Sequence, residues 1–142
     1  MAQRSNRPGS KNSRSGRGGP DVILDVIFED GLLFLALRNI GDEPATDVSV
    51  TFSERVVGLG GDREVSALPL FRRLTFLAPG REIRAFLDTS ASYFARRQPT
   101  QIVANIACRG ADGRPRARQI THDLEIYRQL GYVRKSAEQT EG

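Results

Sequence analysis

The stretch VILDVIFEDGLLFLAL, residues 22–37, decides the fold of this chain. Asp30-Gly31 at its centre is a strong signal for a two-residue hairpin turn. On either side of that turn the apolar residues recur with a period of two, which is typical of a half-buried strand. The first strand would place Val22, Leu24, Val26 and Phe28 on one face, and the second Leu33, Leu35 and Leu37. The stretch therefore predicts an antiparallel β-hairpin that turns one face to a core.

The second of these strands carries apolar residues on both faces, so its register needs an argument. A slip of one residue would exchange the two faces and turn Phe34 inward in place of Leu35. Arg38 lies in line with the even-numbered residues, and that face suits solvent better. We therefore expect the odd-numbered leucines to form the core.

The same period of two continues along the chain. Four further apolar series predict strands: Val48, Val50 and Phe52; Ile83, Ala85 and Leu87; Ile102, Ala104, Ile106 and Cys108; and Ile120, Leu124 and Ile126. Turn signals separate the series, at residues 41–44, 78–80 and 112–113. The sequence thus predicts six strands in an all-β domain, an immunoglobulin-like antiparallel sandwich of about seven strands.

Two segments of this predicted domain have no clear period. Residues 55–80 leave the seventh strand open, and Pro69–Arg73 predicts either a short helical turn or a weak edge strand. Ser90–Thr100 is a polar stretch that we expect to cross from one strand to the next.

The net charge of +4 is unevenly distributed along the 142 residues. Residues 1–20 combine five basic side chains with no acid and many glycines and serines; the basic residues are Arg4, Arg7, Lys11, Arg14 and Arg17. Such a segment cannot bury enough apolar surface to offset the entropy of ordering it, so we expect a disordered basic tail. The other 16 basic and all 17 acidic residues follow it. We therefore expect a near-neutral domain over 21–130 and a polar C-terminal tail over 131–142.

Two passages resemble bacterial CARDB-like immunoglobulin domains. Residues 37–50, LRNIGDEPATDVSV, carry an Asn-x-Gly turn and a small residue before an alternating strand, as those domains do between their second and third strands. Residues 77–80, LAPG, resemble the L-x-P-G turn that leads into their next strand. The resemblance spans roughly residues 32–127 and implies the fold. It implies little about function, because such domains serve as generic spacers and binding modules.

The sequence differs from these domains in its export signals and cysteines. CARDB-like domains usually belong to secreted or surface proteins, whereas no signal-peptide pattern or membrane span is visible in the sequence. Cys108 is the single cysteine, which excludes an intramolecular disulfide and favours a reducing compartment. We therefore expect a cytoplasmic domain without a membrane partner.

No arrangement of reactive residues predicts catalysis, a metal or a cofactor. His122, the single histidine, has no nucleophile at a recognisable spacing, and we interpret it as structural. Cys108 alternates with apolar neighbours, so it should be a small buried hydrophobe. One His and one Cys cannot supply a zinc shell. Residues 58–62, GLGGD, lack the Lys-Ser/Thr of a phosphate-binding loop and read as a flexible loop.

The candidate binding residues come from turns that an immunoglobulin-like topology would bring to one end of the sandwich. They are Asp42, Glu43, Arg109, Asp112, Arg114 and Arg116. Loops on a rigid scaffold often carry binding, although ordinary solvated turns are the simpler interpretation. We therefore expect a non-enzymatic module that binds another protein or acts as a structural accessory. The alternative is an accessory nucleic-acid-binding protein whose five tail cations contact phosphates.

Overall fold

The hairpin of residues 22–37 forms as its sequence predicts. In the computed structural model, which describes residues 18–130, strand β1 (Val22–Glu29) pairs antiparallel with strand β2 (Leu32–Asn39). Asp30 and Gly31 join them with φ angles of 53° and 79°, the left-handed conformations that this type of turn requires. The turn and the alternation therefore specify the same register along the whole hairpin.

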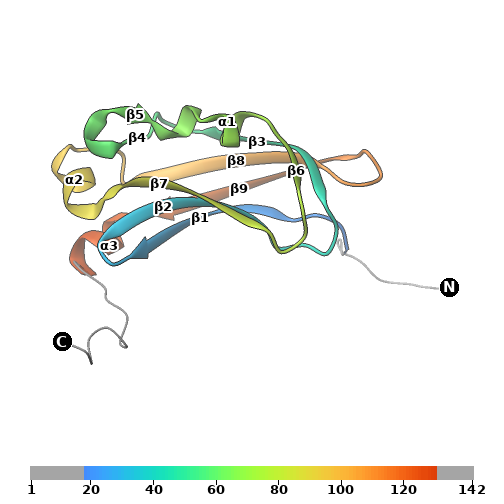
Figure 1. Cartoon of the computed structure of the whole chain (residues 1–142), viewed down its shortest axis with the longest axis horizontal. Helices are drawn as coiled ribbons and strands as arrows, with labels where there is room; N and C mark the ends of the chain where they lie inside the picture. Colours follow the sequence, from blue (N-terminus) through green and yellow to red (C-terminus); the bar gives the residue numbers. More distant parts are fainter. Residues whose placement is uncertain (1–17, 131–142) are drawn as a thin grey trace, which may run out of the picture.

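The described residues form two larger antiparallel sheets and a small one. The first has the strand order β1-β2-β7, with β7 at Glu82–Thr89. The second has the order β6-β3-β8-β9, formed by Leu74–Leu77, Ala45–Phe52, Gln101–Arg109 and Pro115–Asp123 respectively. Strands β4 (Val57–Gly58) and β5 (Arg63–Glu64) make the small sheet. The two larger sheets lie face to face (Figure 1), and the all-β class is confirmed.

Apolar side chains from both larger sheets meet in one core. Leu35 on β2, Val48 on β3 and Ala104 on β8 are all completely buried. Phe34 lies on the opposite, outer face of its sheet and is half-buried, and Arg38 on the same face is exposed. The register with odd-numbered leucines inside is therefore confirmed.

The segment 55–80 holds more structure than its sequence indicated. Between β4 and β6 it contains two 3₁₀ turns and a short helix: η1 (Leu59–Gly61), η2 (Val65–Ala67) and α1 (Pro69–Arg72). Of the two alternatives for Pro69–Arg73, the helical turn is the one that forms. The seventh strand of the two larger sheets, β6, follows it as an edge strand beside β3.

The chain after β7 contains a helix that the sequence did not indicate, and the expectation for the last strand is wrong. The polar stretch Ser90–Thr100 contains a helix, α2 (Ser90–Ala95), which starts where the Thr89 hydroxyl accepts a hydrogen bond from the Ser92 amide at 3.1 Å. The last strand ends at Asp123, because Asp123 accepts from the Glu125 amide at 2.9 Å and starts helix α3 (Glu125–Leu130). Leu124 therefore lies beyond the strand, and Ile126, on the helix, is exposed.

The folded part begins before residue 21. Gly19 and Pro20, which the composition assigned to the tail, are buried, and the Gly19 amide donates to Asp42 Oδ1 at 2.8 Å. The rest of the predicted tail up to residue 17, and the predicted C-terminal tail over 131–142, lie outside the described residues. Among the helices of residues 18–130, none is long and apolar enough to cross a membrane.

Candidate functional site

The two turns that supply the predicted site residues, β2–β3 and β8–β9, lie at one end of the two sheets together with the 78–80 turn (Figure 1). Asn39, the last residue of β2, is completely buried, and its side chain hydrogen-bonds to three segments at this end. Its Oδ1 accepts from the amides of Asp21 and Gly41 at 3.1 and 2.9 Å. Its Nδ2 donates to the carbonyls of Glu43 and Leu77 at 2.8 and 3.1 Å. All four hydrogen bonds of the side-chain amide are therefore made within the protein.

A hollow of about 780 Å³ opens beside this Asn39 junction. It is lined by the entry to β1, the β2–β3 turn and the paired strands β8 and β9; the residues include Asp21, Val22, Ile40, Asp42, Ile106, Cys108, Arg116 and Arg118. Gly41 allows the close approach that shapes it, because a Cβ there would lie 2.3 Å from the Gly19 carbonyl oxygen. The hollow combines buried apolar residues with charges of both signs.

The predicted site residues divide between the hollow and the open turns. Asp42 and Arg116 line the hollow. Arg109 donates to the Gly113 carbonyl at 2.7 Å and lies 3.9 Å from Asp47. The remaining three residues are exposed in the turns: Glu43, Asp112 and Arg114. The structure therefore brings only part of the predicted set into one concave site, and whether that set binds a partner stays a prediction.

His122 and Cys108 occupy structural positions. His122 Nε2 donates to the Leu24 carbonyl at 2.7 Å and so links β9 to β1 across the two sheets. Cys108 is 7% exposed, and burial raises the pKa of its thiol, with Arg116 acting in the opposite direction. In residues 18–130 no three His, Cys, Asp or Glu side chains gather as a metal site would need.

A second candidate site is the outer face of the β1-β2-β7 sheet, called here the apolar face. Its outward residues are Ile23, Asp25, Ile27 and Glu29 on β1, Leu32, Phe34, Ala36 and Arg38 on β2, and Glu82, Arg84 and Phe86 on β7. Ile27, Phe34 and Phe86 stand side by side across the three strands. Phe86 is 38% exposed and packs edge-on against Phe34, with ring centroids 5.7 Å apart.

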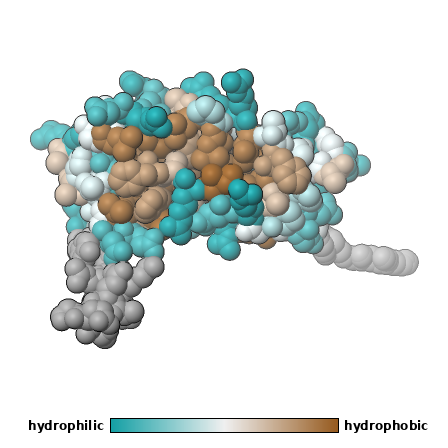
Figure 2. Space-filling model, in the orientation of Figure 1, coloured by the Kyte–Doolittle hydropathy of each residue, from teal (hydrophilic) through white to brown (hydrophobic). Residues whose placement is uncertain are grey.

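Arg84 lies in the middle of the apolar face, and two neighbouring carboxylates compensate its charge. Its guanidinium lies over the Phe34 ring, 5.5 Å from the centroid. Its Nε donates to Glu82 at 2.7 Å and its Nη1 to Glu29 at 3.2 Å. The middle of the face is therefore apolar with a compensated charge, and Figure 2 shows hydrophobic side chains gathered over these strands.

The outer face of the other sheet, called here the polar face, differs sharply. Across its middle stand Thr51 on β3, Asn105 on β8 and Gln119 on β9. Gln119 donates to Asn105 at 3.0 Å, and all three residues are exposed. The middle of one outer face thus carries the residues usual for solvent, and the middle of the opposite one carries aromatic and aliphatic side chains. At the border of the polar face, on the edge strand β6, Phe76 is 55% exposed.

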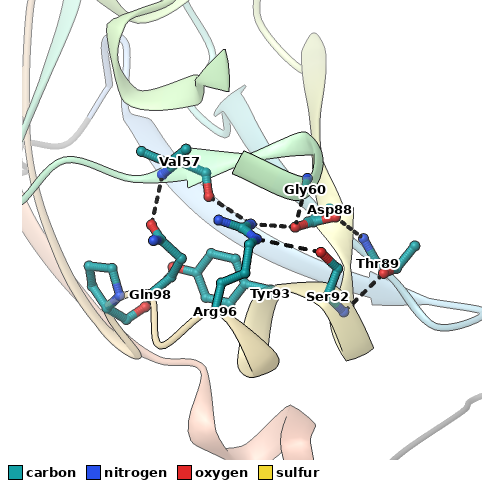
Figure 3. A network of polar contacts seen from close by, with 9 residues as sticks. Val57, Gly60, Asp88, Thr89, Ser92, Tyr93, Arg96 and Gln98 are labelled. Carbon is teal, nitrogen blue, oxygen red and sulfur yellow. Dashed lines mark hydrogen bonds and ion pairs between the residues drawn. The ribbon is translucent and has the colours of Figure 1, made fainter. Parts of the chain in front are cut away.

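A polar network at the C-terminal end of β7 is centred on Asp88 and Arg96 (Figure 3). Asp88 accepts hydrogen bonds from Arg96 and from the amides of Thr89 and Gly60. Arg96 also donates to the Val57 carbonyl at 3.0 Å. Burial raises the pKa of Asp88, but these hydrogen bonds outweigh it, so the net pKa lies below the ordinary value. The network holds the 57–60 segment and helix α2 against β7.

Sequence reasoning missed two features, and only one of them had a signal in the sequence. The apolar face was visible as the even-numbered Phe34 and Ala36 in a strand whose odd residues already form the core. The hollow gave no such signal, because it depends on the approach of the residue 18–21 segment to turns far along the chain. The five tail cations of the nucleic-acid alternative lie outside the described residues.

The fold and these surfaces define a small all-β domain of two packed sheets, one bearing an apolar outer face, with a hollow at one end. The chain belongs to the family described as "Domain of unknown function (DUF8453)", whose family model matches residues 1–128. No curated protein and no solved structure matches the chain.

Proposed function

We propose that this domain is a non-enzymatic protein-interaction module of immunoglobulin-like type, and that it binds a separate protein through the apolar face. The observation that carries the proposal is the contrast between the middles of the two outer faces. Solvent-facing strands normally carry residues like those of the polar face. The row Ile27, Phe34 and Phe86 instead offers apolar surface on a rigid sheet, as interaction sites do.

The charges around the apolar face indicate the chemistry of the partner. Arg84 is compensated within the face by Glu82 and Glu29. Arg38, at one end, is exposed, and its guanidinium makes no hydrogen bond or ion pair with any other described residue. A complementary partner would present an apolar patch with an acidic side chain placed opposite Arg38.

Strand order supports the immunoglobulin-like type. The neighbours β1-β2-β7 and β3-β8-β9 correspond to strands A, B and E and strands C, F and G of that fold. The short β6 is a difference from the constant-type domain. It pairs with β3, whereas the fourth strand of the constant-type domain lies beside the fifth. The relation to CARDB-like domains and the cytoplasmic location remain part of this proposal; the buried free thiol of Cys108 is consistent with a reducing compartment.

The test places a photo-crosslinking amino acid at position 86 or, as a matched control, at position 119 of the full chain in cells that naturally express it. The captured protein is then purified and titrated against wild type, Phe86→Ser, Arg38→Glu and Gln119→Ser. We expect Phe86→Ser and Arg38→Glu each to weaken binding by about tenfold or more, as central and charge-complementary contacts do. Gln119→Ser should bind as wild type does.

Two outcomes would overturn the proposal. Capture that is equal from positions 86 and 119, or binding that Phe86→Ser leaves unchanged, would remove the apolar face as the site. Sedimentation of the purified chain as a dimer that Phe86→Ser dissociates would replace the separate partner by a second copy.

A further inference from the structure

Arg116 on β9 is held in an unusual environment at the edge of the hollow. Its side chain runs between two glycines that have no Cβ to obstruct it. A Cβ added at Gly19 would lie 2.7 Å from Nη2 of Arg116, and one added at Gly110 would lie 3.2 Å from Nε. The guanidinium thus fills the space that side chains at these two positions would occupy.

The guanidinium of Arg116 has no acceptor in the part of the chain that the structure describes. Its Nε is buried without a hydrogen-bond partner, and no ion pair reaches either Nη atom. A buried donor left unpaired is costly, so native proteins usually pair such groups with protein, water or a ligand. Arg116 lines the hollow, which makes the hollow the place where an acceptor would stand.

The other titratable groups around the hollow are already engaged or neutral. Asp21 pairs with Arg118 at 2.7 Å, and Asp42 accepts from the Gly19 amide at 2.8 Å. The Cys108 thiol is kept protonated by its burial. Among the described residues that line the hollow, Arg116 is therefore the cation left without a partner.

The apolar part of the lining is small. Val22, Ile106 and Cys108 line the hollow but are almost completely buried, whereas Ile40 is half exposed. The volume of about 780 Å³ is that of an ordinary small-molecule site. A ligand that fits this lining would carry one anionic group for Arg116 on a compact body with a small apolar part.

We propose that the hollow is a binding site for a small organic anion, a carboxylate or a phosphate monoester, with Arg116 as its anchor. The planar guanidinium offers two parallel donors that match the oxygens of either group. The apolar part of the ligand lies against Ile40. This site is separate from the apolar face, so the two proposals stand or fall independently.

The test titrates the full-length, isotope-labelled chain with benzoate, phenyl phosphate and the neutral benzyl alcohol, and follows the backbone amide signals. We expect benzoate and phenyl phosphate to shift the amides of Gly41, Cys108 and Arg118 with a dissociation constant on the order of 1 mM or tighter. Benzyl alcohol should bind about tenfold more weakly or not at all, because it leaves Arg116 unpaired.

Two variants separate an anchoring role from a packing role. Arg116→Met keeps the length of the side chain and removes its charge, and Arg114→Met is the matched control in the adjacent turn, where the side chain is 83% exposed. Arg116→Met should abolish the shifts and unfold at the same or a higher temperature, since it removes an unpaired buried donor. Arg114→Met should titrate as wild type does.

Three results would overturn the proposal: no shifts at the hollow with either anion, equal shifts with benzyl alcohol, or anion-dependent shifts that survive in Arg116→Met. If Arg116→Met fails to fold, Arg116→Lys decides the matter. Lysine keeps the charge without the planar fork, so it should bind phosphate more weakly but measurably, and benzoate least of all. Unchanged binding of both anions by Arg116→Lys would count against the anchor.

Discussion

Asn39 shows how one side chain can set the geometry of an entire end of this domain. It stands where β2 ends, and its amide group contacts the entry to β1, the β2–β3 turn and the end of β6. Water could satisfy an exposed asparagine, but Asn39 is completely buried, so the protein must supply every partner. The residue therefore fixes the position of three segments with no charge and no metal.

Replacement of Asn39 should destabilise the fold strongly. Asn39→Ala leaves two amides and two carbonyls without their partners, at a cost of about 3 kcal/mol or more. Asn39→Asp should be no better, because a carboxylate oxygen would face the Glu43 and Leu77 carbonyls that now accept hydrogen bonds. Urea unfolding measures both, with Asn105→Ala on the polar face as the control.

Asn105 bonds only to the exposed Gln119, so its loss should change stability by less than about 0.5 kcal/mol. Equal costs for Asn39→Ala and Asn105→Ala would show that the Asn39 junction contributes little beyond an ordinary surface contact.

At the scale of elements, the strands could be predicted and the short helices could not. A half-buried strand is recognised by apolar residues that recur with a period of two. The strands β1, β2, β3, β7 and β8 form where that period is clear. Helix α2 spans only Ser90–Ala95, too short for a helical period to show, and it depends on tertiary contacts such as the hydrogen bond from Tyr93 to the Pro99 carbonyl at 2.6 Å. Sequence reasoning therefore found the framework and missed what covers its ends.

The Asp88–Arg96 network is the contact that joins these covering elements to β7. Arg96→Met should cost about 3–5 kcal/mol near neutral pH, because it leaves the buried Asp88 carboxylate without its cation. Arg97→Met is the matched control, since Arg97 is the exposed neighbour in sequence. Urea unfolding at several pH values measures both variants.

The pH dependence of this cost has a definite sign. In wild type the folded-state pKa of Asp88 lies below its ordinary value, so its stabilisation is complete above about pH 4 and is lost as the pH falls through the folded-state pKa. Without Arg96, Asp88 would lose the hydrogen bond that lowers its pKa most, while burial would still act to raise that pKa. The difference between wild type and Arg96→Met should therefore shrink as the pH falls toward 4, and a constant difference would contradict the assignment.

At the scale of the whole molecule, charge separates the domain from its N-terminal segment. Residues 18–130 hold 14 basic and 15 acidic side chains, whereas residues 1–17 hold five basic ones and no acid. A near-neutral domain gives nucleic acid little electrostatic attraction. Any affinity of the chain for nucleic acid should consequently depend on the five N-terminal cations.

Fluorescence anisotropy with a labelled single-stranded DNA checks this expectation. If all five cations contact phosphates, log K should fall with log[salt] with a slope of about −3.5, or roughly 100-fold between about 50 and 200 mM. Replacing Arg4, Arg7, Lys11, Arg14 and Arg17 by Gln in the full chain should abolish the binding. Binding that survives this replacement would point to the domain and favour the nucleic-acid alternative in a different form.

The chain enters and leaves the two sheets at opposite ends, with Gly18 beside the β2–β3 turn and α3 at the far end (Figure 1). A tension applied between these ends would draw β1 lengthwise past β2, and β9 lengthwise past β8, in opposite directions. Antiparallel ladder bonds lie across the strands, so such a pull loads the whole row at once, where peeling would load one bond at a time. The domain should therefore resist a pull between these two ends more strongly than a pull that peels one strand away.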